Sequence, residues 1–168
     1  MSSTGRQAPT GSTTEDREIV ISRVIDAPRE LVFEAFTVVR HLSHWWGPKG
    51  FTTTTRSFEF GVGGEWDFVM HGPDGTDYSE WITWTEIVRP ERIALLHGES
   101  PGDPSAFTSV LTFEAEGAAT RIEMRTVFPT QALRDEAVER YRAIEGGRQT
   151  LEHLAAYVAA MAKSGGEG

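Results

Sequence analysis

The sequence predicts an α+β fold in which a curved antiparallel sheet grips one long C-terminal helix. Three observations support this prediction. A β-branched apolar run leads directly into short helices, several extended segments then follow with only turns between them, and one long amphipathic segment closes the chain. Because no helix alternates with the later strands, the order favours an antiparallel meander over a parallel sheet.

Length and composition limit the classes of function. The 168 residues fit one domain, and 25 acidic against 16 basic residues give a net charge of −9. An acidic surface disfavours binding to nucleic acids and membrane surfaces. The absence of cysteine excludes disulfides, thiolate nucleophiles and cysteine-type zinc sites. No apolar run approaches the roughly 20 residues that span a bilayer. We expect a cytoplasmic protein with a disordered tail over 1–16, one domain over 17–162 and a second tail over 163–168.

The first elements follow from propensity and capping. Residues 18–25 are β-branched and apolar and predict a strand. Asp26 can cap the next helix, and Pro28 stands where a missing N–H costs nothing. A second short helix is expected over 41–46, before Gly47-Pro48. The apolar residues of the first helix follow helical spacing: Leu31, Val32, Ala35, Phe36 and Val39.

Extended segments make up the middle of the chain. They are predicted over 52–60, 66–70, 78–88, 93–97, 107–114 and 120–128. Turns separate them, and Pro73-Asp74-Gly75 is the clearest, because proline presets φ and glycine accepts a positive φ. Trp81 and Trp84 stand three residues apart in one strand and therefore face opposite sides of the sheet. Which of them faces inward is left open, and an outward tryptophan would favour a homodimer contact.

The final helix is expected to begin after Thr130. Its inward stripe is predicted to be Leu133, Ala137, Tyr141, Ile144, Arg148, Leu151, Ala155 and Val158. Gly146 and Gly147 lie in its middle, where each costs about 1 kcal/mol relative to alanine. They mark a kink or allow a strand or ligand to come close. Arg148 on this stripe either reaches the rim or pairs with Glu145 as a buried polar handle for a ligand.

Several motifs together resemble a known family. Their order and spacing, rather than any single motif, are specific. The chain resembles the START-like, Bet v 1-like (SRPBCC) superfamily, and in particular the branch of the activator of Hsp90 ATPase homologue C-terminal domain. The motifs are Asp26-Ala27-Pro28-Arg29-Glu30-Leu31-Val32-Phe33, His44-Trp45-Trp46-Gly47-Pro48-Lys49-Gly50-Phe51, Gly63-Gly64, Pro73-Asp74-Gly75-Thr76, Arg89-Pro90-Glu91-Arg92-Ile93 and Gly146-Gly147-Arg148-Gln149-Thr150-Leu151-Glu152-His153-Leu154.

The resemblance implies a helix-grip fold with six to seven strands, two short helices at one end and an apolar cavity under the C-terminal helix. Relatives bind lipids, sterols, polyketides or other hydrophobic molecules there. This chain departs from the branch pattern twice. It reads Glu59-Phe60-Gly61-Val62-Gly63-Gly64 where many relatives have an arginine before the glycines, and it has Ile82 where they often have glycine. A close cousin's ligand therefore does not transfer.

The candidate ligand-binding residues combine large rings with a few polar groups. They are Trp45, Trp46, Trp66, Phe68, Met70, Tyr78, His97, Met124, Tyr141, Glu145 and Arg148. Large apolar side chains supply the walls, while His97 and Arg148 would orient a ligand carboxylate or hydroxyl. Neither a metal nor a cofactor is expected. His41 and His44 are three residues apart, but the sequence offers no third ligand.

Three functions compete. The first is binding of a lipid, polyketide or aromatic metabolite, without catalysis. The second is a cofactor-free cyclase or hydrolase with His97 or Glu145 as the base. The third is a protein-interaction module like the co-chaperone after which the branch is named. We expect the first, with a hydrophobic small molecule as the partner rather than nucleic acid or membrane.

Overall fold

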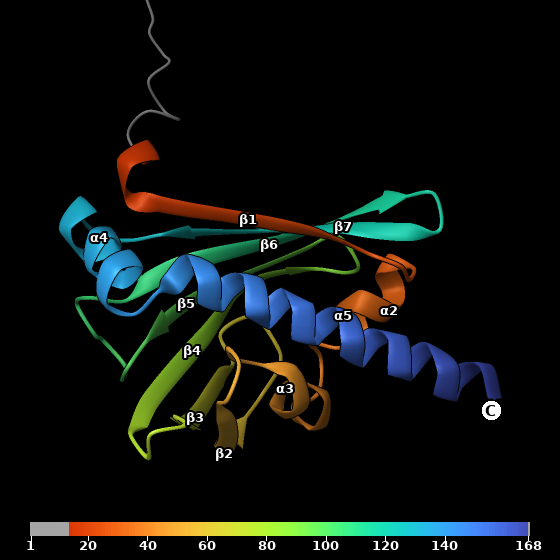
Figure 1. Ribbon diagram of the computed structural model, residues 1–168, viewed down its shortest axis with the longest axis horizontal. Coiled ribbons are helices and arrows are strands. Elements are labelled where there is room, and N and C mark those ends of the chain that lie inside the picture. The colour runs from red at the N-terminus through yellow and green to blue at the C-terminus, as the bar shows by residue number, and fades with distance from the viewer. Residues whose placement is uncertain (1–13, 168) are drawn as a thin grey trace, which may run out of the picture.

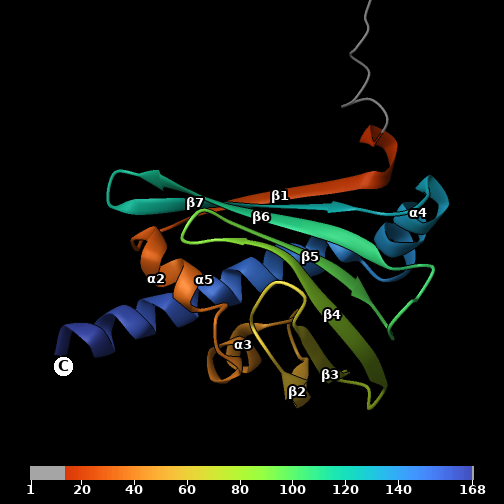
Figure 2. The same ribbon diagram turned by 180° about the vertical axis from the view of Figure 1, so that it is seen from behind.

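The computed structural model describes residues 14–167. Figures 1 and 2 show one sheet with the helices gathered on one of its faces. The tail predicted over 1–16 lies outside the described residues as far as residue 13, and a short 3-10 helix, η1 (Glu15–Arg17), precedes the first strand. Residue 168 of the C-terminal tail also lies outside them.

The sheet contains seven antiparallel strands. They are β1 (Glu18–Ile25), β2 (Thr52–Phe58), β3 (Glu65–His71), β4 (Asp77–Val88), β5 (Arg92–Gly98), β6 (Phe107–Glu116) and β7 (Ala119–Val127). Their order across the sheet is β1-β7-β6-β5-β4-β3-β2. From β2 onward each strand pairs with the next in sequence, which confirms the predicted meander, and β1 returns to pair with β7.

Two short helices join β1 at one edge of the sheet to β2 at the other. They are α2 (Arg29–Glu34) and α3 (Val39–Trp45). Both pack against the C-terminal helix α5 (Ala143–Glu167). The α+β class and the helix-grip arrangement are thereby confirmed, although the sequence placed the boundary between the two short helices a few residues too late.

The C-terminal helix is not continuous, contrary to the sequence prediction. Helix α4 (Gln131–Arg140) is followed by Tyr141 and Arg142, and α5 begins at Ala143. Arg142 adopts a φ of 53°, a left-handed conformation that a continuous α-helix does not contain. Thr130 caps α4 as predicted, by accepting the backbone N–H of Leu133. Helix α5 continues to Glu167, into the segment expected to be a tail.

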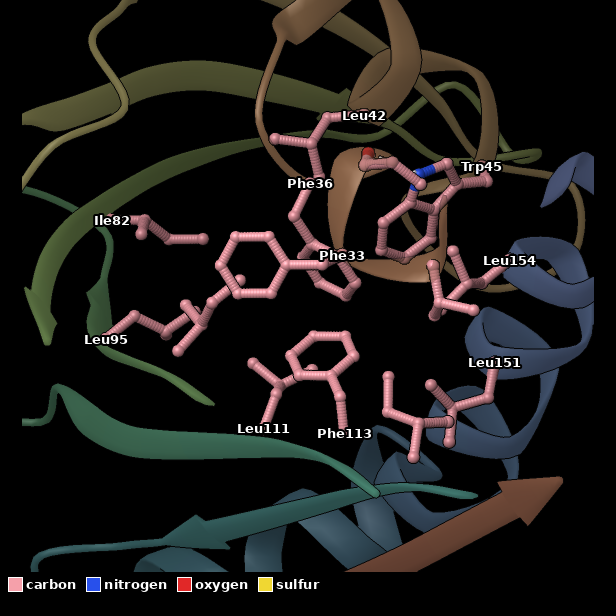
Figure 3. Close-up of a cluster of buried hydrophobic side chains, with 14 of the residues drawn as sticks. Phe33, Phe36, Leu42, Trp45, Ile82, Leu95, Leu111, Phe113, Leu151 and Leu154 are labelled. Atoms are coloured by element: carbon pink, nitrogen blue, oxygen red, sulfur yellow. Dashed lines mark hydrogen bonds between the residues drawn. The ribbon is translucent and has the colours of Figure 1, made fainter. Parts of the chain in front are cut away.

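One dry core lies where α5 meets the two short helices. In Figure 3, Phe36 from the turn after α2 points toward Trp45, Phe113 and Leu154, which come from α3, β6 and α5. All four are almost completely buried, and the rings of Phe36 and Trp45 lie 4.8 Å apart in an edge-to-face arrangement. Such packing leaves no room for a ligand at this end of the fold.

The other half of α5 comes closest to the sheet at Gly147. A Cβ atom at this position would collide with Cδ1 of Ile21 in β1 and would lie 3.3 Å from Cε of Met124 in β7. Ile21 and Met124 are opposite each other in the β1–β7 register. Of the two alternatives that the sequence left open, close approach to a strand therefore accounts for this glycine.

Candidate functional site

A cavity of about 720 Å³ lies between the sheet and the segment that includes α4 and the start of α5. This volume is within the range of small-molecule sites, roughly 300–1,000 Å³. Strands β1, β5, β6 and β7 supply its apolar walls. Among the wall residues are Ile19, Ile21, Leu95, Phe107, Leu111, Met124, Phe128 and Leu133.

The strongest polar feature of the cavity is a histidine–glutamate pair. Nε2 of His97 lies 2.6 Å from Oε1 of Glu80, and the side chains are only 14% and 20% exposed. His97 stands on β5 and Glu80 on the neighbouring strand β4. A neutral imidazole that donates its Nε2–H to the carboxylate keeps Nδ1 as an acceptor. Glu80 therefore orients the ring of His97 within a largely apolar site.

Two hydroxyl groups form a second polar point on the same wall. Ser109 of β6 and Thr126 of β7 are opposite each other in the sheet, and their oxygens lie 3.1 Å apart. Both residues line the cavity. A hydroxyl group both donates and accepts, so this pair can hydrogen-bond to a ligand or to water.

The rim of the cavity comes from two segments that face each other. The loop over 98–105 contributes Glu99 and Ser105, and α4 contributes Glu136 and Arg140. Tyr141 follows α4 and is 58% exposed. Because these exposed residues also line the cavity, they mark its opening to solvent.

Six of the candidate residues lie around this cavity. They are Trp46, Met70, Tyr78, His97, Met124 and Tyr141. Trp46 is half-buried and comes from the end of α3, where its ring lies 6.3 Å from that of His97. The structure thus brings together residues that are up to 95 positions apart, from Trp46 to Tyr141.

Three predicted wall residues are instead part of the packed core. Trp45 is 2% exposed and donates its indole N–H to the carbonyl of Ala35, 3.1 Å away. Trp66 and Phe68 are completely buried and stack on each other with centroids 3.7 Å apart. Other side chains cover all three, so none of them lines the cavity.

Glu145 and Arg148 do not reach the cavity. Both are exposed, and together with Arg142 they border a separate shallow hollow of about 440 Å³ between α4 and the start of α5. Glu145 pairs with Arg142 at 3.4 Å rather than with Arg148. The predicted inward stripe was wrong at this turn, because Gly147 and not Arg148 faces the sheet. Glycine has no side chain, so a hydrophobic pattern in the sequence does not identify this position as inward.

Sequence reasoning missed Glu80 and Ser109, and it did not count Thr126 among the candidates although Thr126 shares a strand face with the candidate Met124. The signal for Glu80 was its place in the alternation Tyr78, Glu80, Ile82 and Trp84, whose last two members are completely buried.

Trp84 is therefore the inward tryptophan of β4 and Trp81 the outward one, which resolves the alternative left open by the sequence.

A second histidine lies outside the cavity and ties α3 to α5. Nδ1 of His41 is 2.6 Å from the hydroxyl of Tyr157, and His41 is 9% exposed. Burial lowers the pKa of His41, and the positive charge of Arg40 lowers it further, while Glu34 opposes the shift. The lowered pKa of His41 favours the neutral imidazole. Among the residues that the structure describes, no group of three side chains is placed to hold a metal ion.

Comparison with known proteins gives one family and many similar structures. The model of the family described as Activator of Hsp90 ATPase homolog 1-like protein matches residues 26–159. A solution structure of a protein from Arthrobacter aurescens superposes with a TM-score of 0.80 and 26% identity, and covers 88% of both chains. A comparison with curated proteins found no match.

Two crystal structures show the same fold at lower identity. A protein from Nitrosomonas europaea has a TM-score of 0.79 at 21% identity, over 88% of this chain and 97% of its own. A protein from Mycobacterium smegmatis has a TM-score of 0.78 at 22% identity, over 88% and 94%. Within the described part of this chain, no helix is long and apolar enough to cross a membrane.

Proposed function

The chain belongs to the family of Activator of Hsp90 ATPase homolog 1-like proteins, and on this premise we propose that it binds a hydrophobic or amphipathic small molecule in the cavity beneath α4 and the start of α5. The observation that carries the proposal is the cavity itself. It is large, walled mainly by apolar side chains from four strands, and open at a rim of polar residues.

Burial of apolar surface would supply the affinity. A ligand that loses about 300 Å² of apolar surface to the cavity gains roughly 7 kcal/mol at about 25 cal/mol per Å². Association costs offset part of this gain, so we expect micromolar or weaker binding for a small aromatic molecule. The Glu80–His97 pair and the Ser109–Thr126 pair would set its orientation.

Native mass spectrometry of freshly purified protein tests the proposal first. A bound molecule at near-stoichiometric amount, identified after extraction, would support it. Titration with Nile red, a neutral apolar dye, provides a second measurement that needs no natural ligand. Protein that carries nothing and leaves Nile red fluorescence unchanged would overturn the proposal.

The Glu80–His97 geometry favours a second candidate, cofactor-free acid–base catalysis on the bound molecule. A histidine held by a carboxylate is a suitable general base when its other ring nitrogen faces the substrate. Incubating the co-purified molecule with the protein and following its conversion tests this candidate. Conversion that is lost in His97→Gln would support it, and an unchanged molecule would exclude it.

A role as a protein-interaction module receives less support. Trp81 faces outward from β4, but it is half-buried rather than exposed. The open cavity, in contrast, is the feature expected of a binding protein and not of a closed interaction module.

A further inference from the structure

The charges that line the cavity are unequally distributed. Among the described residues that line it, four carry carboxylates, and Arg140 is the one arginine or lysine. Arg140 stands 3.5 Å from Glu136 on the same helix, so these two charges largely compensate each other. The remaining carboxylates are Glu80, Glu99 and Asp103.

These three carboxylates gather at the His97 end of the cavity. Trp81 of β4 pairs with Gly98, the last residue of β5, so Glu80 precedes this pair on β4 and Glu99 follows it in the loop after β5. Asp103 folds back onto the same place, because one of its oxygens accepts the backbone N–H of Glu99 at 2.9 Å. Their combined field makes this end of the cavity negative and raises the local concentration of cations.

The Glu80–His97 pair itself offers an acceptor. Nε2 of His97 lies 2.6 Å from Oε1 of Glu80, so the other carboxylate oxygen, Oε2, remains an acceptor whichever proton the imidazole carries. Among the side chains that the structure describes, Oε2 has no hydrogen-bond partner. A ligand group that meets Oε2 must therefore bring a donor.

Aromatic rings surround the same point. The ring of Phe107 lies 4.8 Å from that of His97, and the ring of Trp46 lies 6.3 Å from it. Both residues line the cavity. Aromatic faces attract cations, and they attract them more strongly where water is excluded.

We propose that the ligand carries a protonated amine, which binds at Glu80 and His97 while its apolar body fills the cavity. This inference rests on the proposed function and deepens it. It reverses the expectation that Arg148 orients a ligand carboxylate, because Arg148 is outside the cavity and the interior end is acidic. Fatty acids and other carboxylates are therefore poor ligands.

Three probes with one ring system test the inference: 2-(naphthalen-1-yl)ethylamine, 2-(naphthalen-1-yl)ethanol and naphthalene-1-acetate. Each probe is titrated against bound Nile red at neutral pH to measure whether it displaces the dye. We expect the amine to bind at least about tenfold more tightly than the alcohol, since charge-assisted hydrogen bonds exceed neutral ones in strength. The carboxylate is expected to bind most weakly of the three.

Two charge-removing variants locate the effect. In Glu80→Gln the ratio of amine affinity to alcohol affinity should fall to about one, because the carboxylate charge that favours the amine is gone. Glu152→Gln removes the same charge from an exposed position on α5 that does not line the cavity, and it should keep the advantage. Thermal unfolding of both variants checks that they fold.

The outcomes separate the two proposals. If Nile red does not bind, the proposed function fails. If Nile red binds but the carboxylate competes as well as the amine, or none of the three probes competes, the amine assignment is wrong and the binding function stands. An amine advantage that persists in a folded Glu80→Gln protein overturns the assignment to Glu80.

Discussion

Gly147 in α5 lies directly against Ile21 in β1, so that any side chain at position 147 would occupy the space of the isoleucine methyl group. Gly146, the preceding residue, has more room, because a Cβ there would stand 3.6 Å from Pro48, an ordinary contact distance. The two adjacent glycines therefore differ in what they allow. Gly147 is in tight contact with the sheet, whereas Gly146 lines the cavity.

Alanine substitutions at these positions should separate the two roles. Gly146→Ala should raise the free energy of unfolding by up to about 1 kcal/mol, because alanine favours the helix. Gly147→Ala gains the same propensity but displaces Ile21, so it should be less stable than Gly146→Ala by about 1 kcal/mol or more. Urea denaturation measures both. Equal stabilities would contradict a tight contact at Gly147.

The adjacent tryptophans should also behave differently. Trp45→Ala removes a ring from the packed core and should lower the free energy of unfolding by about 3–5 kcal/mol. Trp46 is half-buried at the cavity, so Trp46→Ala should cost less stability and should weaken Nile red binding. Urea denaturation and dye titration, performed at a temperature where both variants are folded, make the comparison. Normal dye binding by Trp46→Ala would remove this residue from the site.

Filling the cavity should abolish binding without unfolding the protein. Ala137 of α4 lines the cavity, whereas Ala132 of the same helix is exposed. Ala137→Trp should weaken Nile red binding at least about tenfold, equivalent to about 1.4 kcal/mol. Ala132→Trp adds the same side chain outside the cavity and should bind the dye normally. Similar binding by the two variants would show that the dye occupies another place.

The burial of His41 predicts a pH dependence of stability. The pKa of His41 in the folded state is below its ordinary value of 6.5, mainly because of burial. As pH falls below 6.5, His41 takes up a proton in the unfolded chain before it does so in the folded protein. The contribution of neutral His41 to the free energy of unfolding is therefore complete above pH 6.5. It is lost as pH falls from 6.5 through the lower pKa of the folded state.

Substitution of His41 should therefore flatten the stability profile. Between about pH 7.5 and about pH 5.5, His41→Gln should lose less unfolding free energy than the unmodified protein, because no buried imidazole must be protonated. His44→Gln removes an exposed neighbour whose ring stacks on Tyr157 and which adds only the smallest of the effects that lower the pKa of His41, so it should change the profile less than His41→Gln does. Urea denaturation at the two pH values measures the difference. A profile unchanged by His41→Gln would contradict the lowered pKa.

Much of the fold could be predicted from the sequence. The strands follow from β-branched and aromatic runs separated by proline and glycine turns, and all seven predicted strands are present. The family resemblance carried by motifs such as His44-Trp45-Trp46-Gly47-Pro48 was confirmed, because the family model matches residues 26–159. These features are local in the sequence or depend only on the order of its motifs. They can therefore be recognised without knowledge of the folded structure.

The helix break and the cavity residues required the folded chain. Leu133, Ala137 and Tyr141 continue a helical spacing without glycine or proline, so the left-handed conformation of Arg142 has no local signal. Similarly, Trp45 and Trp46 are chemically identical neighbours. Only the packing of α3 on the sheet decides that one is covered by Phe36 and the other faces the cavity.

The sequence by itself determined the strands, their antiparallel order and the helices that cover them, while the tertiary structure decided which strand face is inside. In β4 the deciding feature is a register shift between Trp84 and Glu86. Opposite residues of paired strands share a face, so Ile87 faces inward together with its partner Ile93. Thr85 is the extra residue of the bulge. Because it has no partner on β5, Trp84 is opposite Leu95 and also faces inward. Without this bulge, Glu80 would point to solvent and His97 would lack its partner. A one-residue shift exchanges the two faces of a strand, and its energy comes from packing between distant segments.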